Sequence, residues 1–156
     1  MTGKLKRVTV SRDELESRVR DLVKQNQSLY EEARLDALTR LPNRRRLHED
    51  LGRMYANADR YARPFALALL DVDDFRRYNS RLGYAGGDRA IQRVANLLLE
   101  AVRHGDTVYR FGGDEFVVVM QAQDLDQGIY VTDRLRAEIA RTSPSEGEER
   151  ITLSGG

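Results

Sequence analysis

Apolar residues are sparse in the first part of the chain and recur there at intervals of seven. The repeat consists of Leu15, Leu22 and Leu29, with Val19, Asn26 and Ala33 following four residues after them. This spacing is a heptad with leucine at d and one polar residue at a, a pattern that favours a parallel, in-register dimer of helices. A single amphipathic helix lying on its own domain remains the alternative for residues 12–35.

The pattern changes at Pro42, which cannot continue a helix and pushes the residue before it toward extended backbone. Asn43 can cap a new helix, in which apolar residues recur at helical spacing over 47–58. Pro64 ends that helix, because its ring fits poorly inside one. The uninterrupted apolar run 65–70 then predicts a buried strand.

Helices and strands alternate over the rest of the chain. The predicted elements are helices at 74–82, 87–103 and 124–141 and strands at 107–110, 116–120 and 151–154. A glycine-containing turn between the second and third strands is typical of a hairpin. The complete order, α, α, β, α, α, β, β, α, β, predicts an α+β sandwich built on a mixed sheet.

Composition narrows the possible functions. The 156 residues fit one domain with a helical appendage, and 26 basic against 25 acidic side chains argue against a general binder of nucleic acid or of membranes. With no cysteine and only His48 and His104, the sequence offers no disulfide, thiolate zinc site or histidine metal cluster. No apolar run reaches the roughly 18 residues of a membrane span, and the start lacks a secretion signal, so a cytoplasmic protein is expected.

Carboxylates gather at two points where packing does not require them. Asp71 and Asp73 close the apolar strand, and Asp114 and Glu115 follow two glycines at the tip of the hairpin. If the hairpin pairs beside that strand, Asp71 and Asp114 meet, and such oxygen ligands suit Mg²⁺ and the phosphates it accompanies. This favours a metal-assisted phosphoryl or nucleotidyl transfer. The alternative is that Asp71 and Asp73 cap the next helix and that the hairpin tip is only a turn.

Four segments together resemble the GGDEF domain family, the diguanylate cyclases. They are Asp36-Ala-Leu-Thr-Arg-Leu-Pro-Asn-Arg44, Asp71-Val-Asp-Asp-Phe-Arg-Arg-Tyr-Asn79, Gly83-Tyr-Ala-Gly-Gly-Asp88 and Arg110-Phe-Gly-Gly-Asp-Glu-Phe116. They occur in the order and at the spacing of that family. The resemblance implies a palm-like, mainly antiparallel sheet flanked by helices. It also implies an enzyme that condenses two GTP into cyclic di-GMP and releases two pyrophosphates across a homodimer.

The resemblance assigns catalytic roles by position. Asp71, Asp114 and the backbone carbonyl of Val72 are the implied ligands of Mg²⁺ or Mn²⁺. Asp114 would also help to deprotonate the attacking hydroxyl, and Glu115 would add negative charge. Arg76 stands where the family has a lysine, and it would steady phosphate charge.

The resemblance also implies a substrate-binding set of Asn79, Asp88, Phe75 and Tyr84. Asn79 and Asp88 would read the guanine edge, because an amide donates and accepts and a carboxylate accepts from both N1–H and the amino group. The structural alternatives are that Asn79 caps the end of one helix and Asp88 the start of the next. Tyr84 replaces the histidine that the family has at this position, and Ser80 replaces a common aspartate.

A second ligand site is implied just before the hairpin. Arg103 and Asp106 stand where the family has its R-x-x-D inhibitory site, which binds a cyclic di-GMP dimer, and Arg134 falls at the position of a supporting arginine. Arg103 would stack on guanine and hold phosphate, and Asp106 would pair with the base edge. The alternative is an ordinary Arg–Asp pair on the surface.

The family continues after Ser154 with a strand and a helix that supplies a Lys and an Arg to the triphosphate, whereas this sequence stops at Gly156. The sequence is therefore interpreted as a fragment or as a truncated product. We expect a helical linker or dimerisation segment at 1–35 and a GGDEF domain lacking that last segment at 36–156. Three functions stay open: a product-inhibited cyclase, a non-catalytic module that binds cyclic di-GMP, and an inactive dimerisation fragment.

Overall fold

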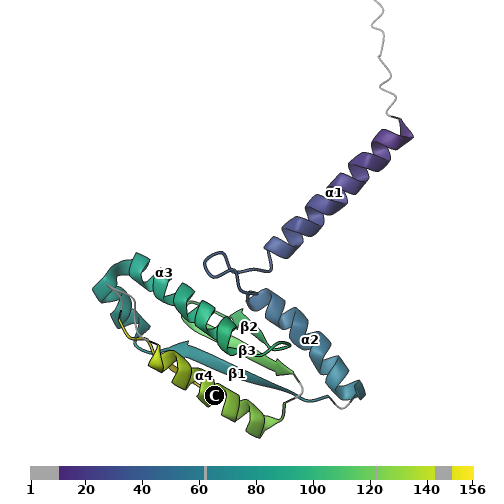
Figure 1. Ribbon diagram of the computed structural model, residues 1–156. Helices are drawn as coiled ribbons and strands as arrows, with labels where there is room; N and C mark the ends of the chain where they lie inside the picture. The colour runs from purple at the N-terminus through teal and green to yellow at the C-terminus, as the bar shows by residue number, and fades with distance from the viewer. Residues whose placement is uncertain (1–10, 62, 122, 143–148) are drawn as a thin grey trace, which may run out of the picture. The chain divides into compact units, whose positions relative to one another are not determined.

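A computed structural model of the chain describes residues 11–61, 63–121, 123–142 and 149–156 (Figure 1). The chain divides into two compact units, Met1–Ala33 and Arg34–Gly156. Each unit is described by itself. In the described part of the chain, no helix combines the length and the apolar character that crossing a membrane requires.

The first unit contains the helix α1 (Arg12–Glu32). Its start is fixed by a capping box, in which the Glu14 amide donates to Ser11 Oγ at 3.3 Å and the Ser11 amide donates to the Glu14 carboxylate at 3.4 Å. None of its residues is buried, and Leu15, Leu22 and Leu29 are 57%, 63% and 68% exposed. The predicted helix is therefore present, with its leucine stripe open.

The second unit is built on a four-stranded sheet in the order β2-β3-β1-β4. The strands are β1 (Phe65–Val72), β2 (Thr107–Arg110), β3 (Glu115–Gln121) and β4 (Leu153–Gly155). All three strand pairings are antiparallel, and an isolated parallel bridge joins Asn43 to Arg110, the last residue of β2. The α+β class predicted from the sequence is confirmed.

Helices cover the two faces of this sheet unequally (Figure 1). The larger core joins one face to α3 (Phe75–Ala101) and α4 (Leu125–Arg141), and α2 (Arg44–Tyr61) packs on the other face. The larger core includes Leu70, Phe116, Val118, Ile91, Val94, Leu98 and Leu135, and the smaller one Leu47, Tyr109, Val117 and Val119. Alternate strand residues therefore serve opposite cores, as the pleat requires.

The helices predicted at 74–82 and 87–103 form the one element α3. Its backbone departs from helical geometry at Gly83, where φ is 73° and ψ is 172°. A positive φ of this kind costs glycine little because it has no Cβ. The chain changes direction at this one residue and resumes the helix at once.

Candidate functional site

The tip of the β2–β3 hairpin lies beside the end of β1. In the antiparallel register Asp71 is paired with Glu115, and the Val72 amide donates to the Asp114 carbonyl at 3.1 Å. The backbone amides of Phe111 and Gly112 both donate to the Glu115 carbonyl, at 2.9 and 3.3 Å, which closes the turn. The sheet therefore brings together the two carboxylate-bearing segments that lie far apart in the sequence.

Negative charge is concentrated at this edge. Partial burial raises the pKa of Asp71, and the charges of Asp114, Glu115 and Asp73 raise it further. A cation would relieve this repulsion, and Arg76 lies exposed in the first turn of α3. No three His, Cys, Asp or Glu side chains of the described residues form a ready metal cage. Mg²⁺ commonly takes one or two carboxylates together with substrate phosphates, so the residues present fit a metal shared with a nucleotide.

Neither Asp71 nor Asp73 caps the helix that follows. The N-cap of α3 is Asp74, which has a φ of 54° and makes no capping hydrogen bond through its side chain. Asp73 instead accepts from the hydroxyl groups of Thr152 and Ser154, at 2.6 and 2.5 Å. Asp73 therefore joins β1 to β4, and Asp71 keeps its carboxylate at the exposed edge.

Arg110 holds the hairpin tip in place. Its guanidinium donates to the carbonyl oxygens of Gly112 and Gly113, at 3.4 and 2.7 Å, and to Asp36 Oδ1 at 2.8 Å. Burial alone would raise the pKa of Asp36, but hydrogen bonds from Arg110 and Thr39 hold it below its ordinary value. No pattern in the sequence connects Asp36 with Arg110, so this contact is not predicted from the two motifs.

The segment 36–44, which contains Asp36, makes two further contacts with the hairpin. The Arg110 amide donates to the Pro42 carbonyl at 2.9 Å, and the Arg44 guanidinium lies 4.6 Å from the centre of the Phe111 ring. A cation over an aromatic face is attracted by its quadrupole. Residues 36–44 therefore brace the signature turn through backbone, ionic and aromatic contacts.

The residues predicted to bind guanine lie along the first half of α3. Asn79 is inside the helix, not at its end, and its Oδ1 is buried without a hydrogen-bond partner among the described residues. Gly87 packs against this amide, and Phe75 lies beside the same glycine. Asp88 is exposed within α3, so it does not cap a helix start, and Tyr84 is 85% exposed.

A separate cavity of about 470 Å³ contains all three residues of the predicted inhibitory site. Arg103 donates to Asp106 Oδ1 at 3.4 Å and to the Gln121 carbonyl at 2.5 Å. Arg134 donates to the Ala101 carbonyl at 2.9 Å. The Arg–Asp pair is therefore present, but the Asp106 side chain is only 1% exposed, so it is not an ordinary surface pair. Both residues line the hollow that Arg134 also lines.

Comparison with known proteins agrees with this arrangement. Residues 33–156 match the family model described as diguanylate cyclase, GGDEF domain. The chain belongs to the GGDEF domain family. Diguanylate cyclase is the enzyme class of its similar curated relatives.

Two of these relatives are much longer than this chain. The diguanylate cyclase DgcP of Pseudomonas aeruginosa is 41% identical over 110 residues, which cover 70% of this chain and 16% of the relative. The diguanylate cyclase DosC of Escherichia coli K12 is 34% identical over 125 residues, which cover 79% of this chain and 27% of the relative. The chain therefore spans less than a third of the length of either relative.

Solved structures extend the likeness to the fold. The coiled coil and GGDEF domain of DgcB from Caulobacter crescentus, in complex with c-di-GMP, matches with a TM-score of 0.82 at 26% identity, covering 92% of this chain and 78% of that one. The diguanylate cyclase SiaD of Pseudomonas aeruginosa, in complex with its activator SiaC, matches with a TM-score of 0.76 at 32% identity, covering 93% and 58%.

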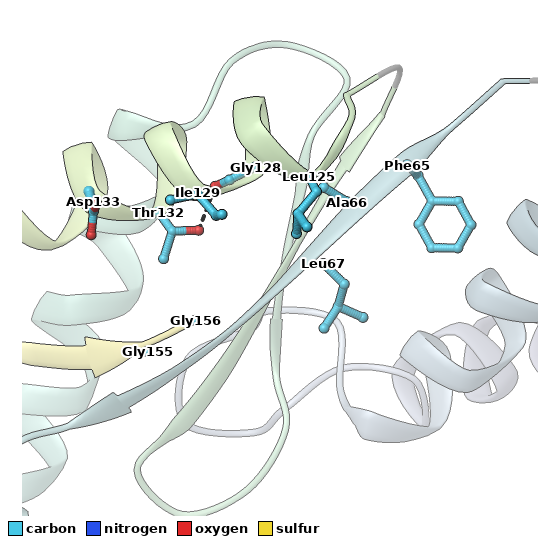
Figure 2. Close-up of a pocket in the computed structure, with 10 residues that line it drawn as sticks. All are labelled: Phe65, Ala66, Leu67, Leu125, Gly128, Ile129, Thr132, Asp133, Gly155 and Gly156. Carbon is cyan, nitrogen blue, oxygen red and sulfur yellow. Dashed lines mark hydrogen bonds between the residues drawn. The ribbon is translucent and has the colours of Figure 1, made fainter.

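Another hollow in the GGDEF domain, of about 290 Å³, lies between β1 and α4 (Figure 2). Ala66 points toward α4 and Leu67 away from it, and the Thr132 hydroxyl donates to the Gly128 carbonyl at 2.7 Å. None of the residues predicted for catalysis, substrate binding or inhibition lines this hollow. Its mostly apolar walls distinguish it from the carboxylate edge.

Proposed function

We propose that this chain is a diguanylate cyclase that condenses two GTP into cyclic di-GMP. The 3′-hydroxyl oxygen of each GTP would attack the α-phosphorus of the other, and each attack would release one pyrophosphate. The observation that carries the proposal is the pairing of Asp71 with Glu115, next to Asp114, in a hairpin fixed by Arg110. Carboxylates placed together at a sheet edge suit phosphoryl chemistry better than they suit packing.

Each residue of this edge has a role in the proposal. Asp71 and Asp114, with the carbonyl of Val72, would hold Mg²⁺ or Mn²⁺, which when bound offsets phosphate charge. Asp114 would accept the proton of the 3′-hydroxyl, and Glu115 would hold further negative charge beside it. The exposed Arg76 would contact phosphate oxygens, which its planar guanidinium can engage in pairs.

Guanine recognition is assigned to α3. The buried Oδ1 of Asn79 has no partner among the described residues, so a donor from the base would satisfy it. Asp88 is exposed on the same helix and would accept from the same edge. Phe75 and Tyr84 would complete the contact surface. An acceptor that gains a hydrogen-bond donor only when GTP binds discriminates against bases that lack that donor.

The reaction requires two nucleotides, which favours a homodimer. The leucine stripe of α1 is open, and a second copy of the helix would cover it through the heptad. Cyclic di-GMP is proposed to inhibit the enzyme by binding in the cavity of Arg103, Asp106 and Arg134. Cation and carboxylate together in one hollow suit a ligand with phosphates and a guanine edge.

The decisive experiment is incubation of the purified chain with GTP and Mg²⁺, followed by chromatography of the products. We expect cyclic di-GMP and pyrophosphate from the unchanged chain. Asp114→Ala should lower the rate by at least about 100-fold, the loss typical of a group that transfers a proton. Asp133→Ala is the matched control, because Asp133 is 66% exposed and pairs with Arg136 across one turn of α4.

Two results would contradict the proposal. If Asp114→Ala and Asp133→Ala turn over GTP at the same rate, the carboxylate edge is not the active site. If the folded, unchanged chain yields no cyclic di-GMP but binds it, the non-catalytic binding module replaces the cyclase as the better function.

A further inference from the structure

The cavity of Arg103, Asp106 and Arg134 holds two buried acceptors that nothing in the described residues satisfies. Asp106 Oδ1 accepts from Arg103 Nε at 3.4 Å and from the Gln121 amide at 3.2 Å, whereas its Oδ2 is buried without a partner. Gln123 Oε1 is buried without a partner too, in a residue only 7% exposed that lines the same cavity. Burying an acceptor without a donor costs free energy, so a ligand that supplies a donor to either atom would recover that cost.

The capping hydrogen bonds of α4 do not use the Gln123 side chain. It directly precedes Asp124, the N-cap of α4, and the reciprocal capping bonds run between Asp124 and Gln127. A residue before the N-cap often packs as an apolar staple on the fourth helical residue, but that residue here is Gly128. The cap begins directly after Gln123, and the Oε1 atom of its side chain has no hydrogen-bond partner among the described residues.

Two acceptors without donors, on residues that line the same cavity, call for a ligand with two donors. The Watson–Crick edge of guanine presents N1–H and the amino group, whereas adenine presents one amino donor beside an acceptor. A carboxylate normally takes both guanine donors, but Asp106 has only Oδ2 open, because Oδ1 already accepts twice. The ring of Tyr130, 72% exposed at the same cavity, and two guanidinium groups suit a stacked base with phosphates.

We infer that Gln123 is the second guanine-reading residue of this cavity. Asp106 Oδ2 accepts one donor of the base, and Gln123 Oε1 accepts the other. The inference rests on the proposed binding of cyclic di-GMP at this cavity, and it adds to it the residue that sets selectivity for guanine over adenine.

The test is calorimetric titration of the full chain with cyclic di-GMP and with cyclic di-AMP. Gln123→Met keeps the length of the side chain and removes the acceptor, so the affinity for cyclic di-GMP should fall by about 10-fold, the value of one hydrogen bond. Weak binding of cyclic di-AMP should be unchanged, so the preference for guanine falls by the same factor. Gln92→Met is the matched control on α3, where the Gln92 amide donates to the Leu38 carbonyl far from this cavity's lining, and its affinity should equal that of the unchanged chain.

Thermal melting of the free variants separates recognition from structure. Because Gln123→Met removes a buried acceptor that lacks a partner, it should keep or raise the melting temperature while it weakens binding. Gln123→Asn withdraws the amide by one methylene, keeps its polarity and should also lose affinity. Equal cyclic di-GMP affinity in the unchanged chain and in both folded Gln123 variants would overturn the inference.

Different results would contradict the proposed inhibitory site as a whole. If Arg103→Ala leaves cyclic di-GMP binding unchanged, or if the unchanged chain does not bind it, the cavity is not the inhibitory site and the role of Gln123 falls with it. If Arg103→Ala loses binding and Gln123→Met does not, only the role of Gln123 is wrong.

Discussion

The amide of Asn79 depends on a glycine for its position. Its buried Oδ1 makes no hydrogen bond to the described residues, and Gly87 leaves the space that this oxygen fills. A Cβ on Gly87 would overlap Oδ1, and it would lie 2.8 Å from Asn79 Cγ and 3.2 Å from the Phe75 ring. The glycine is therefore required by close approach within one helix, and not by its backbone angles.

Gly87→Ala should weaken GTP binding without unfolding the protein. The new methyl group displaces the Asn79 amide, so the KM for GTP should rise about 10-fold, the value of one lost hydrogen bond to the base. Alanine favours a helix over glycine by about 1 kcal/mol. This gain should offset most of the destabilisation caused by the crowding, so the melting temperature should change little. Steady-state kinetics and thermal melting test both expectations.

Gly52→Ala provides the control for this prediction, because Gly52 lies in α2 with nothing within 4 Å of an added Cβ. It should leave the KM unchanged and stabilise the fold by about 0.5–1 kcal/mol. Equal KM values in the two variants would show that Asn79 does not contact the base.

Among the elements, the segment 36–44 and the β2–β3 hairpin behave as one structural unit. Arg110 connects them, because it binds Asp36 on one side and the carbonyls of the hairpin tip on the other. The Asp36 and Arg110 side chains are 15–23% exposed, so water screens their attraction only in part. The position of the signature turn therefore depends on a residue outside the hairpin.

Local sequence patterns predict elements well, and they do not predict such pairs. The prolines and the apolar run place α2 and β1, and the pattern gives β2 the bounds that the structure has. Asp36 and Arg110 are 74 positions apart, and no periodicity links them. The capping role considered for Asp73 fails for the same reason, since its partners Thr152 and Ser154 arrive from a distant strand.

Asp36→Asn should destabilise the second unit by about 1–2 kcal/mol at neutral pH, because a charge-assisted hydrogen bond to Arg110 becomes a neutral one. The folded-state pKa of Asp36 lies below its ordinary value of 3.8, so this contribution is complete above that pH. It is lost as the pH falls through the lower, folded-state pKa. Urea unfolding of the unchanged chain and of Asp36→Asn over a pH series should therefore show that the difference between their free energies of unfolding narrows in acid.

Asp133→Asn is the comparison for this pH series. Asp133 forms an exposed pair with Arg136, and exposed pairs of this kind contribute about 0–1 kcal/mol. Asp36→Asn should lower the free energy of unfolding more than Asp133→Asn does. If the two losses are equal, Arg110 holds the hairpin without Asp36.

For the whole molecule, assembly is the remaining requirement of the proposed reaction. Each cyclic di-GMP contains two nucleotides, so two GTP-bearing units must face one another. The helix α1 buries none of its own residues, which leaves its heptad stripe available to a second copy. Asn26, at an a position, would favour pairing with itself in a parallel dimer, which sets the two helices in register.

Leu22→Lys should convert the proposed dimer to a monomer, because it places a charge at the central d position of the heptad. The folded monomer should not be destabilised, since Leu22 is 63% exposed in the single chain. GTP turnover should fall at least about 10-fold at low micromolar protein, because the effective concentration that the helix pair provides is lost. The rate per subunit of this variant should then rise with protein concentration, because two monomers must meet in solution before they can react.

Ser17→Lys is the control, because it introduces the same residue at an outward f position. It should keep both the proposed dimer and the rate. Sedimentation velocity measures the assembly, and a Leu22→Lys protein that stays dimeric would show that another surface holds the two copies together.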